Sequence, residues 1–284
     1  MNIILGATGQ VGSILVEELL KKGQPVRAVV RNELKAQKLK NMGAEVFVAD
    51  YFELDELKKA FQGGRSVFLL TPENPESNHF FKDTQIILQN YREAILSTDI
   101  IKLVGLSSMG AQHETGTGNL LASHMLENAF SDMDIEQIFV RPAYYFSNWV
   151  GYIDLVKEHG ILPTFFPVNM ELPMIAPQDV GKFLSEVMLR QEPQEKVYEL
   201  SGLEAYNSLE IAKIFEEVMN RDVTLQQILP EDWENTFLQV GFSKDGAENL
   251  IQMTQSVIDG KTQSETNHPI ALSMDFKSYL KNTL

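Results

Sequence analysis

The sequence predicts an α/β protein in which a doubly wound parallel sheet carries a smaller, discontinuous C-terminal α+β lobe. A glycine-rich turn, Gly6–Gly12, stands between a short apolar run and an amphipathic helical pattern. Short apolar runs then alternate with helical patterns, as in parallel sheets with helices on both faces. This alternation stops after Arg141-Pro142. At 284 residues the chain has room for a nucleotide-binding unit of the Rossmann type and a second lobe.

The nucleotide-binding unit is expected over residues 1–150, with its sheet completed by residues 178–200. A substrate or partner lobe is expected over 151–284, mostly as 151–177 and 201–284. Six strands are predicted in the first unit, because short apolar runs there are bounded by turn residues. They are Asn2–Leu5, Pro25–Val30, Glu45–Ala49, Ser66–Leu70, Lys102–Leu106 and Gln137–Val140.

The first connection between strands has the pattern of an amphipathic helix. Val11, Leu15 and Leu19 fall on one helical face, and glutamates and lysines spaced by four form the other. Gly23 supplies a C-terminal stop. The next connection is expected to be helical over Glu33–Met42.

The C-terminal half has a different pattern of predicted elements. Prolines interrupt the segment Leu162–Pro177, so regular alternation of strand and helix has ended there. A helix over Gln178–Arg190 and a strand over Lys196–Leu200 are expected to return to the sheet. The remainder reads as helices with one strand near Val223–Ile228.

Composition excludes several function classes. The 24 basic and 39 acidic residues give a formal charge of −15, which disfavours direct binding of nucleic acid. The chain has no cysteine, so disulfides and thiol chemistry are excluded. The N-terminus lacks the pattern of a secretory signal, and no apolar stretch reaches the roughly 18 residues that span a bilayer. We therefore expect a cytoplasmic protein.

The histidines give no sign of a metal site or of a Ser-His-Asp triad. Four of them stand alone in the sequence. They are His79, His113, His159 and His268.

The glycine-rich turn is the first candidate binding element. Its glycines allow a tight turn, close approach of a phosphate and packing of helix on strand, and the helix that follows offers free N–H groups to an anion. The alternative is an ordinary tight βα turn. The expected cofactor-binding residues of the turn are Gly6, Thr8, Gly9, Gln10, Val11 and Gly12.

Arg31 indicates which dinucleotide is bound. In NAD binders an acidic residue about twenty positions after the glycines holds the ribose hydroxyls. Here Arg31 stands at that place, directly after Val30, and its guanidinium can pair with a 2′-phosphate. NADP(H) is therefore expected in preference to NAD(H). The alternatives are a solvated arginine, or a ribose hydroxyl held by the nearby Glu33.

The ends of the next strands supply further candidates. Asp50 and Tyr51 end the third strand, where a carboxylate can accept from the adenine amino group and a neighbour can flank the ring. Asp50 is equally suited to be the N-cap of the following helix. Strand ends of an open sheet meet at the ligand edge, so the nicotinamide is expected beside two further groups. These are Leu70-Thr71-Pro72 and Ser107-Ser108.

These motifs resemble the NmrA-like family of atypical short-chain dehydrogenase/reductases over nearly the whole chain. Besides the glycine turn, the similarity rests on segments after the strands and in the C-terminal half. They are Val30-Arg31, Ala49-Asp50, Leu106-Ser107-Ser108, Arg141-Pro142, Asn148, 176–181, 198–202 and 210–212. The family includes NAD(P)H:quinone reductases, a triphenylmethane dye reductase and catalytically silent redox sensors. The resemblance therefore implies an NADP(H)-binding oxidoreductase fold.

The usual acid of short-chain dehydrogenases is missing. That acid is a tyrosine with a lysine four positions later, and no tyrosine of this chain has one. Nor is there any lysine between Lys102 and Lys157. His124 stands where quinone and dye reductases of the family have a histidine, one residue out of step. We expect His124 to contact the nicotinamide ribose or relay a proton, with Glu127 orienting it. The alternative is a partly exposed helix histidine.

An aromatic stretch after Arg141-Pro142 is the last candidate. Planar acceptors need stacking over the nicotinamide more than a strong protein acid, since their own oxygen or nitrogen can take a proton from water. Aromatic residues directly after a strand are more often core, so one or two of the four are expected to face the pocket. They are Tyr144, which is the catalytic candidate, Tyr145, Phe146 and Trp149.

Two functions follow from these observations. The first is an NADPH-dependent reductase of quinones or other planar acceptors. The second is a catalytically silent sensor that binds NADP(H) and acts through a protein partner, which the missing Tyr/Lys pair would suit. The surroundings of His124 favour the enzyme. No membrane is expected to take part, and a homo-oligomer is compatible with either function.

Overall fold

A computed structural model describes residues 1–192 and 195–284. Its main sheet has eight strands in the order β13-β10-β6-β5-β4-β1-β2-β3, and every neighbouring pair is parallel. The strand order reverses between β1 and β4, which is the place where open α/β sheets bind ligands. The strands are β1 Asn2–Ile4, β2 Val26–Val30, β3 Glu45–Val48, β4 Ser66–Leu70, β5 Lys102–Leu106, β6 Glu136–Pro142, β10 Val197–Gly202 and β13 Ile270–Leu272.

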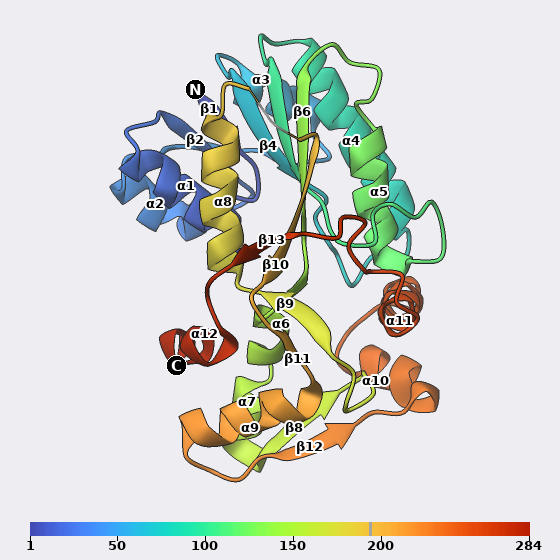
Figure 1. Ribbon diagram of the computed structural model, residues 1–284. Coiled ribbons are helices and arrows are strands. Elements are labelled where there is room, and N and C mark those ends of the chain that lie inside the picture. Colours follow the sequence, from blue (N-terminus) through green and yellow to red (C-terminus); the bar gives the residue numbers. More distant parts are fainter. Residues whose placement is uncertain (193–194) are drawn as a thin grey trace.

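Helices cover both faces of this sheet (Figure 1). On one face lie α1 (Gly12–Lys21), η1 (Glu33–Ala36), α2 (Gln37–Asn41) and α8 (Pro177–Leu189). On the other lie α3 (Leu54–Phe61), α4 (Phe80–Leu96) and α5 (Leu121–Asn128), the last preceded by η2 (Gly118–Leu120).

Each face has its own apolar core, because successive side chains of a buried strand point to opposite faces. Ile4 packs with Leu15 and Val180 on the α1 and α8 face. Its neighbour Ile3 packs with Tyr91 of α4 on the other. The doubly wound fold predicted from the sequence is confirmed.

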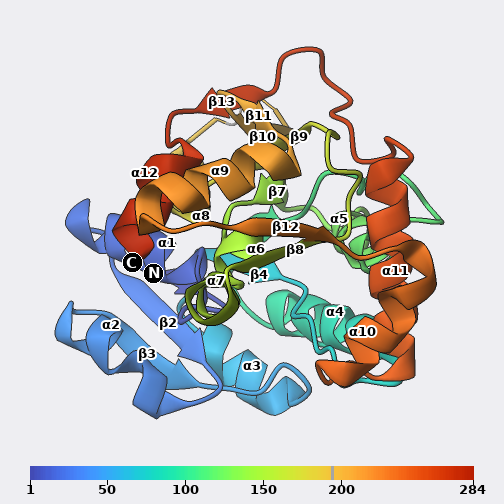
Figure 2. The same cartoon turned by 90° about the horizontal axis from the view of Figure 1, so that it is seen from below.

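The C-terminal elements form a lobe at the carboxyl ends of the strands. Two small sheets, of order β11-β9-β7 and β12-β8, form part of it. Figure 2 views it from below, with α7, β8 and β12 in front of the main sheet. Its elements are β7 Tyr144–Tyr145, α6 Ser147–Val150, α7 Ile153–His159, β8 Ile161–Thr164, β9 Leu172–Ile175, β11 Ala205–Tyr206, α9 Ser208–Met219, β12 Thr224–Gln227, η3 Pro230–Asp232, α10 Trp233–Gln239, α11 Lys244–Ile258 and α12 Phe276–Thr283.

In the main sheet and its connections, the structure corrects two predictions made from the sequence. The single helix expected over Glu33–Met42 is a 3₁₀ turn followed by a short α-helix, and the Asn32 side chain caps the turn by accepting from the Leu34 amide. The sheet also contains β13, which the sequence did not predict. This strand has only three residues, and they are exposed or half-buried, so it lacks the pattern of a buried strand.

The strands of the lobe were also mostly missed, for a related reason. Pro163 lies in β8 and Pro173 in β9, and a proline inside a run argues against a strand. Only β12, expected near Val223–Ile228, was predicted. The division of function between residues 1–150 and 151–284 stays a prediction. Among the described residues, no helix is both long and apolar enough to cross a membrane.

Candidate cofactor-binding and active site

The glycine turn is packed so closely that two of its residues have to be glycine. Gly6 has a φ of +60°, and a Cβ there would lie 2.4 Å from Cδ2 of Leu70. A Cβ on Gly12 would lie 2.3 Å from the carbonyl oxygen of Gly6. Thr8, Gly9 and Gln10 are exposed at the tip.

Helix α1 begins directly at this turn and presents its amino end there. No side chain caps the first turn, and no acidic residue lies in it. The Ser13 amide donates to the Gly9 carbonyl at 3.0 Å, and the other N–H groups of the first turn and the positive end of the helix dipole are open to an anion. This cradle fits a dinucleotide pyrophosphate.

Tyr51 supports the glycine turn, and the adenine contact expected for it from the sequence stays a prediction. Its ring is only 5% exposed, and its hydroxyl accepts a hydrogen bond of 3.1 Å from the Gly6 amide. Burial raises the pKa of Tyr51, although the Gly6 amide and the nearby Arg31 oppose this. The ring meets Tyr91 edge to face at 6.0 Å, which fixes it in the core.

Arg31 and Asp50 flank Tyr51 on the surface. The Arg31 guanidinium lies 6.0 Å from the centre of the Tyr51 ring, and its side chain is exposed at the end of β2. Asp50 is not the N-cap of α3, because that helix begins after Glu53. Its carboxylate instead accepts from the Phe52 amide at 3.0 Å. An adenine contact of Asp50 stays a prediction, as does a phosphate contact of Arg31.

The expected nicotinamide residues follow β4 and β5 at the same edge of the sheet. Leu70 contacts Gly6, and its carbonyl accepts from the Tyr91 hydroxyl at 3.3 Å. Thr71 and Pro72 come next and are half-buried. Ser107 is buried, and its amide donates to the Val140 carbonyl of β6. The parallel register brings these strand ends together with the glycine turn.

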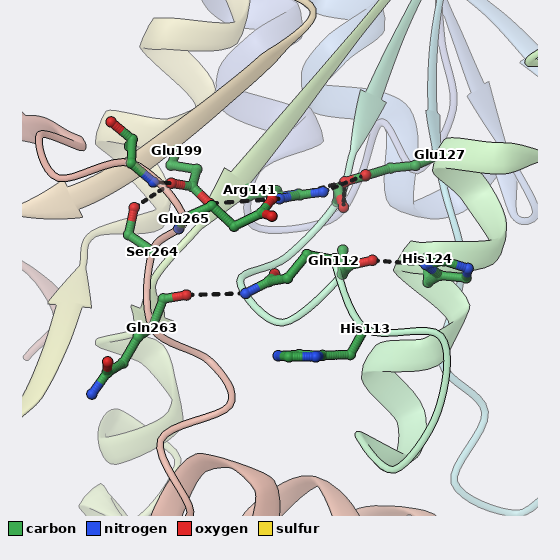
Figure 3. A network of polar contacts seen from close by, with 12 residues as sticks. Gln112, His113, His124, Glu127, Arg141, Glu199, Gln263, Ser264 and Glu265 are labelled. Atoms are coloured by element: carbon green, nitrogen blue, oxygen red, sulfur yellow. Dashed lines mark hydrogen bonds and ion pairs between the residues drawn. The ribbon is translucent and has the colours of Figure 1, made fainter.

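A buried arginine organises the region beyond Ser107 (Figure 3). Arg141, at the end of β6, donates from Nε and Nη2 to the two carboxylate oxygens of Glu127 at 2.8 and 2.7 Å. Its Nη1 pairs with Glu265 and lies 3.6 Å from Glu199. Burial alone would lower the pKa of Arg141, but Glu127 and Glu265 raise it overall.

The same cluster fastens the segment 259–269, which connects α11 to β13 and is called the strap below. The buried Glu199 carboxylate accepts from the Ser264 hydroxyl and from the amides of Glu265 and Thr266 at 3.1 and 2.9 Å. Burial raises the pKa of Glu199, but these donors and Arg141 outweigh it and leave the pKa below its ordinary value.

The loop after β5 also contacts the strap. Gln112 donates from its side chain to the Gln263 carbonyl at 3.1 Å, and the His113 ring lies 2.9 Å from the Lys261 carbonyl. The strap, this loop and α5 therefore form one hydrogen-bonded layer at the carboxyl ends of β5 and β6 (Figure 3).

The predicted partnership of His124 with Glu127 is wrong. Nδ1 of His124 lies 2.9 Å from the Ala111 carbonyl, so it must carry the hydrogen there, and Nε2 lies 3.3 Å from the Asn128 amide. Glu127 is engaged by Arg141 and by the Ser107 hydroxyl at 2.6 Å. A role of His124 in catalysis or ribose binding stays a prediction.

Two of the four aromatic candidates belong to the core. Phe146 and Trp149 are 1% and 2% exposed, whereas Tyr144 and Tyr145 are half-buried. Tyr144 meets Phe166 edge to face at 5.5 Å, and burial raises its pKa well above the ordinary value. A tyrosine that holds its proton so firmly is a poor general acid.

Sequence reasoning missed several polar residues of the site. Arg141 was noted only within a motif, and Glu199 and Glu265 were not singled out. A signal was present, since Arg141 and Glu199 lie inside apolar strand patterns, where a charge needs a partner. The hydroxyls of Ser108 and Tyr145 are buried and have no hydrogen-bond partner among the described residues.

The chain is similar to several known proteins. The model of the NmrA-like family matches residues 2–278. The chain is 25% identical to quinone oxidoreductase 2 of Escherichia coli (strain K12) over 99% of each chain. It is 22% identical to an NAD(P)H azoreductase of Xenophilus azovorans, over 89% of this chain and 86% of that one.

Solved structures show the same fold. An Escherichia coli NADPH-dependent quinone oxidoreductase in complex with NADPH superposes with a TM-score of 0.78 at 23% identity, covering 100% of this chain and 99% of that one. The Citrobacter sp. triphenylmethane reductase in complex with NADP(H) gives 0.80 at 21% identity, covering both chains fully.

Removing the Tyr51 hydroxyl should loosen the glycine turn. Tyr51→Phe takes away the acceptor of the Gly6 amide, so the free energy of unfolding should fall by about 1–3 kcal/mol. The Kd for NADPH, measured by fluorescence titration, should rise about 5-fold. The control is Tyr279→Phe in the lobe, which should leave this Kd unchanged. An unaltered Kd in Tyr51→Phe would contradict a supporting role.

Stability should depend on Glu199 in acid. A carboxyl whose pKa is lowered by folding stabilises the protein fully above its unfolded pKa, and this contribution is lost as the pH falls through the folded value. Urea denaturation should therefore show a fall in stability below about pH 4.5 that is smaller in Glu199→Gln. Glu171→Gln, which removes an exposed carboxylate just before β9, should keep the acid fall of the wild type.

Proposed function

Since this chain belongs to the NmrA-like family, we propose that it is an NADPH-dependent reductase of quinone-like or other planar acceptors. The observation that carries the proposal is the glycine turn, in which Gly6 and Gly12 leave no space for side chains and an uncapped helix end faces the tip. The names of the two curated relatives, a quinone oxidoreductase and an azoreductase, support the same chemistry.

The chain's own residues divide the cofactor between them. The glycine turn and the first turn of α1 hold the pyrophosphate, and Arg31 pairs with the 2′-phosphate. The ends of β4 and β5, with Thr71 and Ser107, border the nicotinamide. When bound there, NADPH supplies the hydride.

A conjugated acceptor can take the proton of the reaction from water, and the tyrosines of this chain are poorly suited to supply it. Reduction of a quinone consumes one hydride and one proton, and gives the hydroquinone anion and then the hydroquinone. Tyr144 keeps its proton too firmly to serve as the acid, and no tyrosine is paired with a lysine four positions on. This site suits an acceptor whose reduced anion is delocalised and can be protonated by solvent after hydride transfer. A simple ketone does not suit it, because the alkoxide that forms needs an acid during the transfer.

Purified protein should oxidise NADPH when a panel of quinones and azo dyes is added. The measurement is the loss of NADPH absorbance, with a cofactor-only blank to correct for direct reaction with oxygen. Turnover with at least one planar acceptor and none with simple ketones is expected. Firm NADPH binding without turnover of any acceptor would refute the reductase hypothesis. It would favour the alternative, a catalytically silent sensor that acts through a protein partner.

Arg31 should decide between the two dinucleotides. Arg31→Ala should raise the KM for NADPH about 10- to 100-fold, because a charge-assisted contact to the 2′-phosphate is lost, and should change the KM for NADH little. Arg65→Ala is the matched control, since Arg65 is also exposed but lies just before β4, at the opposite edge of the sheet. Equal losses for both dinucleotides would refute the assignment.

A further inference from the structure

The Ser107 hydroxyl is the last member of a hydrogen-bonded chain that begins in the strap. Glu265 of the strap pairs with Arg141, Arg141 holds Glu127, and Glu127 accepts from Ser107 Oγ at 2.6 Å. Glu127, Arg141, Glu199, Glu265 and the strap backbone at Ser264 appear together in Figure 3. This series of hydrogen bonds therefore connects Glu265 in the strap to Ser107 at the end of β5.

The direction of each hydrogen bond in this chain is determined. Arginine can only donate, and both oxygens of Glu127 accept from it. Glu127 therefore presents an acceptor to Ser107, and the single hydroxyl hydrogen of Ser107 is committed to it. What remains on Ser107 Oγ is lone-pair density, which can accept a hydrogen bond but cannot donate one.

Glu127 keeps this polarity because Arg141 is itself held in place. Arg141 and Glu199 are 5% and 6% exposed, so neither is free to exchange partners with bulk water. The Glu265 side chain is the open member of the cluster, with 57% exposure. Its ion pair with Arg141 is the contact by which the strap joins the series of hydrogen bonds.

We propose that Ser107 recognises the carboxamide of the nicotinamide as a hydrogen-bond acceptor only, by accepting from its amino group, and that Glu127, Arg141 and Glu265 are positioning residues that impose this polarity. The inference rests on the proposed function, which places the nicotinamide at the ends of β4 and β5. A carboxamide has a carbonyl and an amino end of nearly equal size. An acceptor-only hydroxyl distinguishes the two ends and thereby fixes the orientation of the carboxamide group on the nicotinamide ring.

Binding measurements test the contact without any need for turnover. Ser107→Ala should weaken NADP⁺ binding about 10-fold by calorimetry, and should weaken the 3-acetylpyridine analogue less than about 2-fold, since that analogue keeps the carbonyl but has no amino group. Binding of 2′,5′-ADP, which lacks the nicotinamide half, should be unchanged. No loss for NADP⁺, or equal losses for NADP⁺ and the analogue, would overturn the proposal.

A double-mutant cycle tests the positioning role. Glu265→Gln should weaken NADP⁺ binding about 3-fold in the wild type and should add nothing in the Ser107→Ala background, because its effect passes through Ser107. Glu217→Gln, which also removes an exposed ion pair in the lobe, is the control and should have no effect in either background. Additive losses would show that Glu265 acts on the fold in general and would refute its role.

The outcomes separate this inference from the function on which it rests. If the wild-type protein binds NADP⁺ but reduces no acceptor, the proposed activity is refuted. The affinities of wild type and Ser107→Ala for NADP⁺ and its analogue then still decide the role of Ser107. A wild-type protein that binds neither NADP⁺ nor 2′,5′-ADP overturns both.

Discussion

The close contact between the glycine turn, the start of α1 and the end of β4 is the constraint on which the site depends. Gly12 lies against the Gly6 carbonyl, and Gly6 lies against Leu70, so a side chain at either glycine would push helix and strand apart. Because the helix starts that close to the strand, its first amides have no side-chain partner and face the switch point of the sheet. Tyr51, which follows β3, completes the arrangement by accepting a hydrogen bond from the Gly6 amide.

The second constraint is the buried charge of Arg141. A guanidinium inside a sheet has to be compensated, and Glu127 alone neutralises it. Glu199 and Glu265 add negative charge: the amides and hydroxyl of the strap offset that of Glu199, and the exposed side chain of Glu265 is solvated. The C-terminal segment is therefore drawn across the strand ends before it adds β13 beside β10. The electrostatics of one arginine thus connect the lobe to the nucleotide-binding sheet.

Local patterns predicted the sheet well, because buried parallel strands are continuous apolar runs and amphipathic helices have a clear period. Those patterns located the glycine turn, Arg31 and the strand ends, all of which depend on nearby sequence. They did not locate β13, whose residues are exposed, or the role of Tyr51, which needs a contact 45 residues away. Helical spacing placed His124 near Glu127, but it could not show that Arg141, which arrives from the next strand, takes both carboxylate oxygens.

The polar groups of the site differ in what they can do chemically, and this limits the acceptor. Ser107 has its hydrogen committed to Glu127, and burial raises the pKa of Tyr144, so both are poorly suited to deliver a proton as charge develops on an acceptor. The site can still hold a dinucleotide and bring a planar ring against it, since both tasks depend on shape and apolar contact. A conjugated acceptor spreads the arriving electron pair over its own ring and needs no acid in that step. For the reductase that we propose, the missing tyrosine–lysine pair therefore favours conjugated acceptors over simple ketones and leaves hydride transfer itself possible.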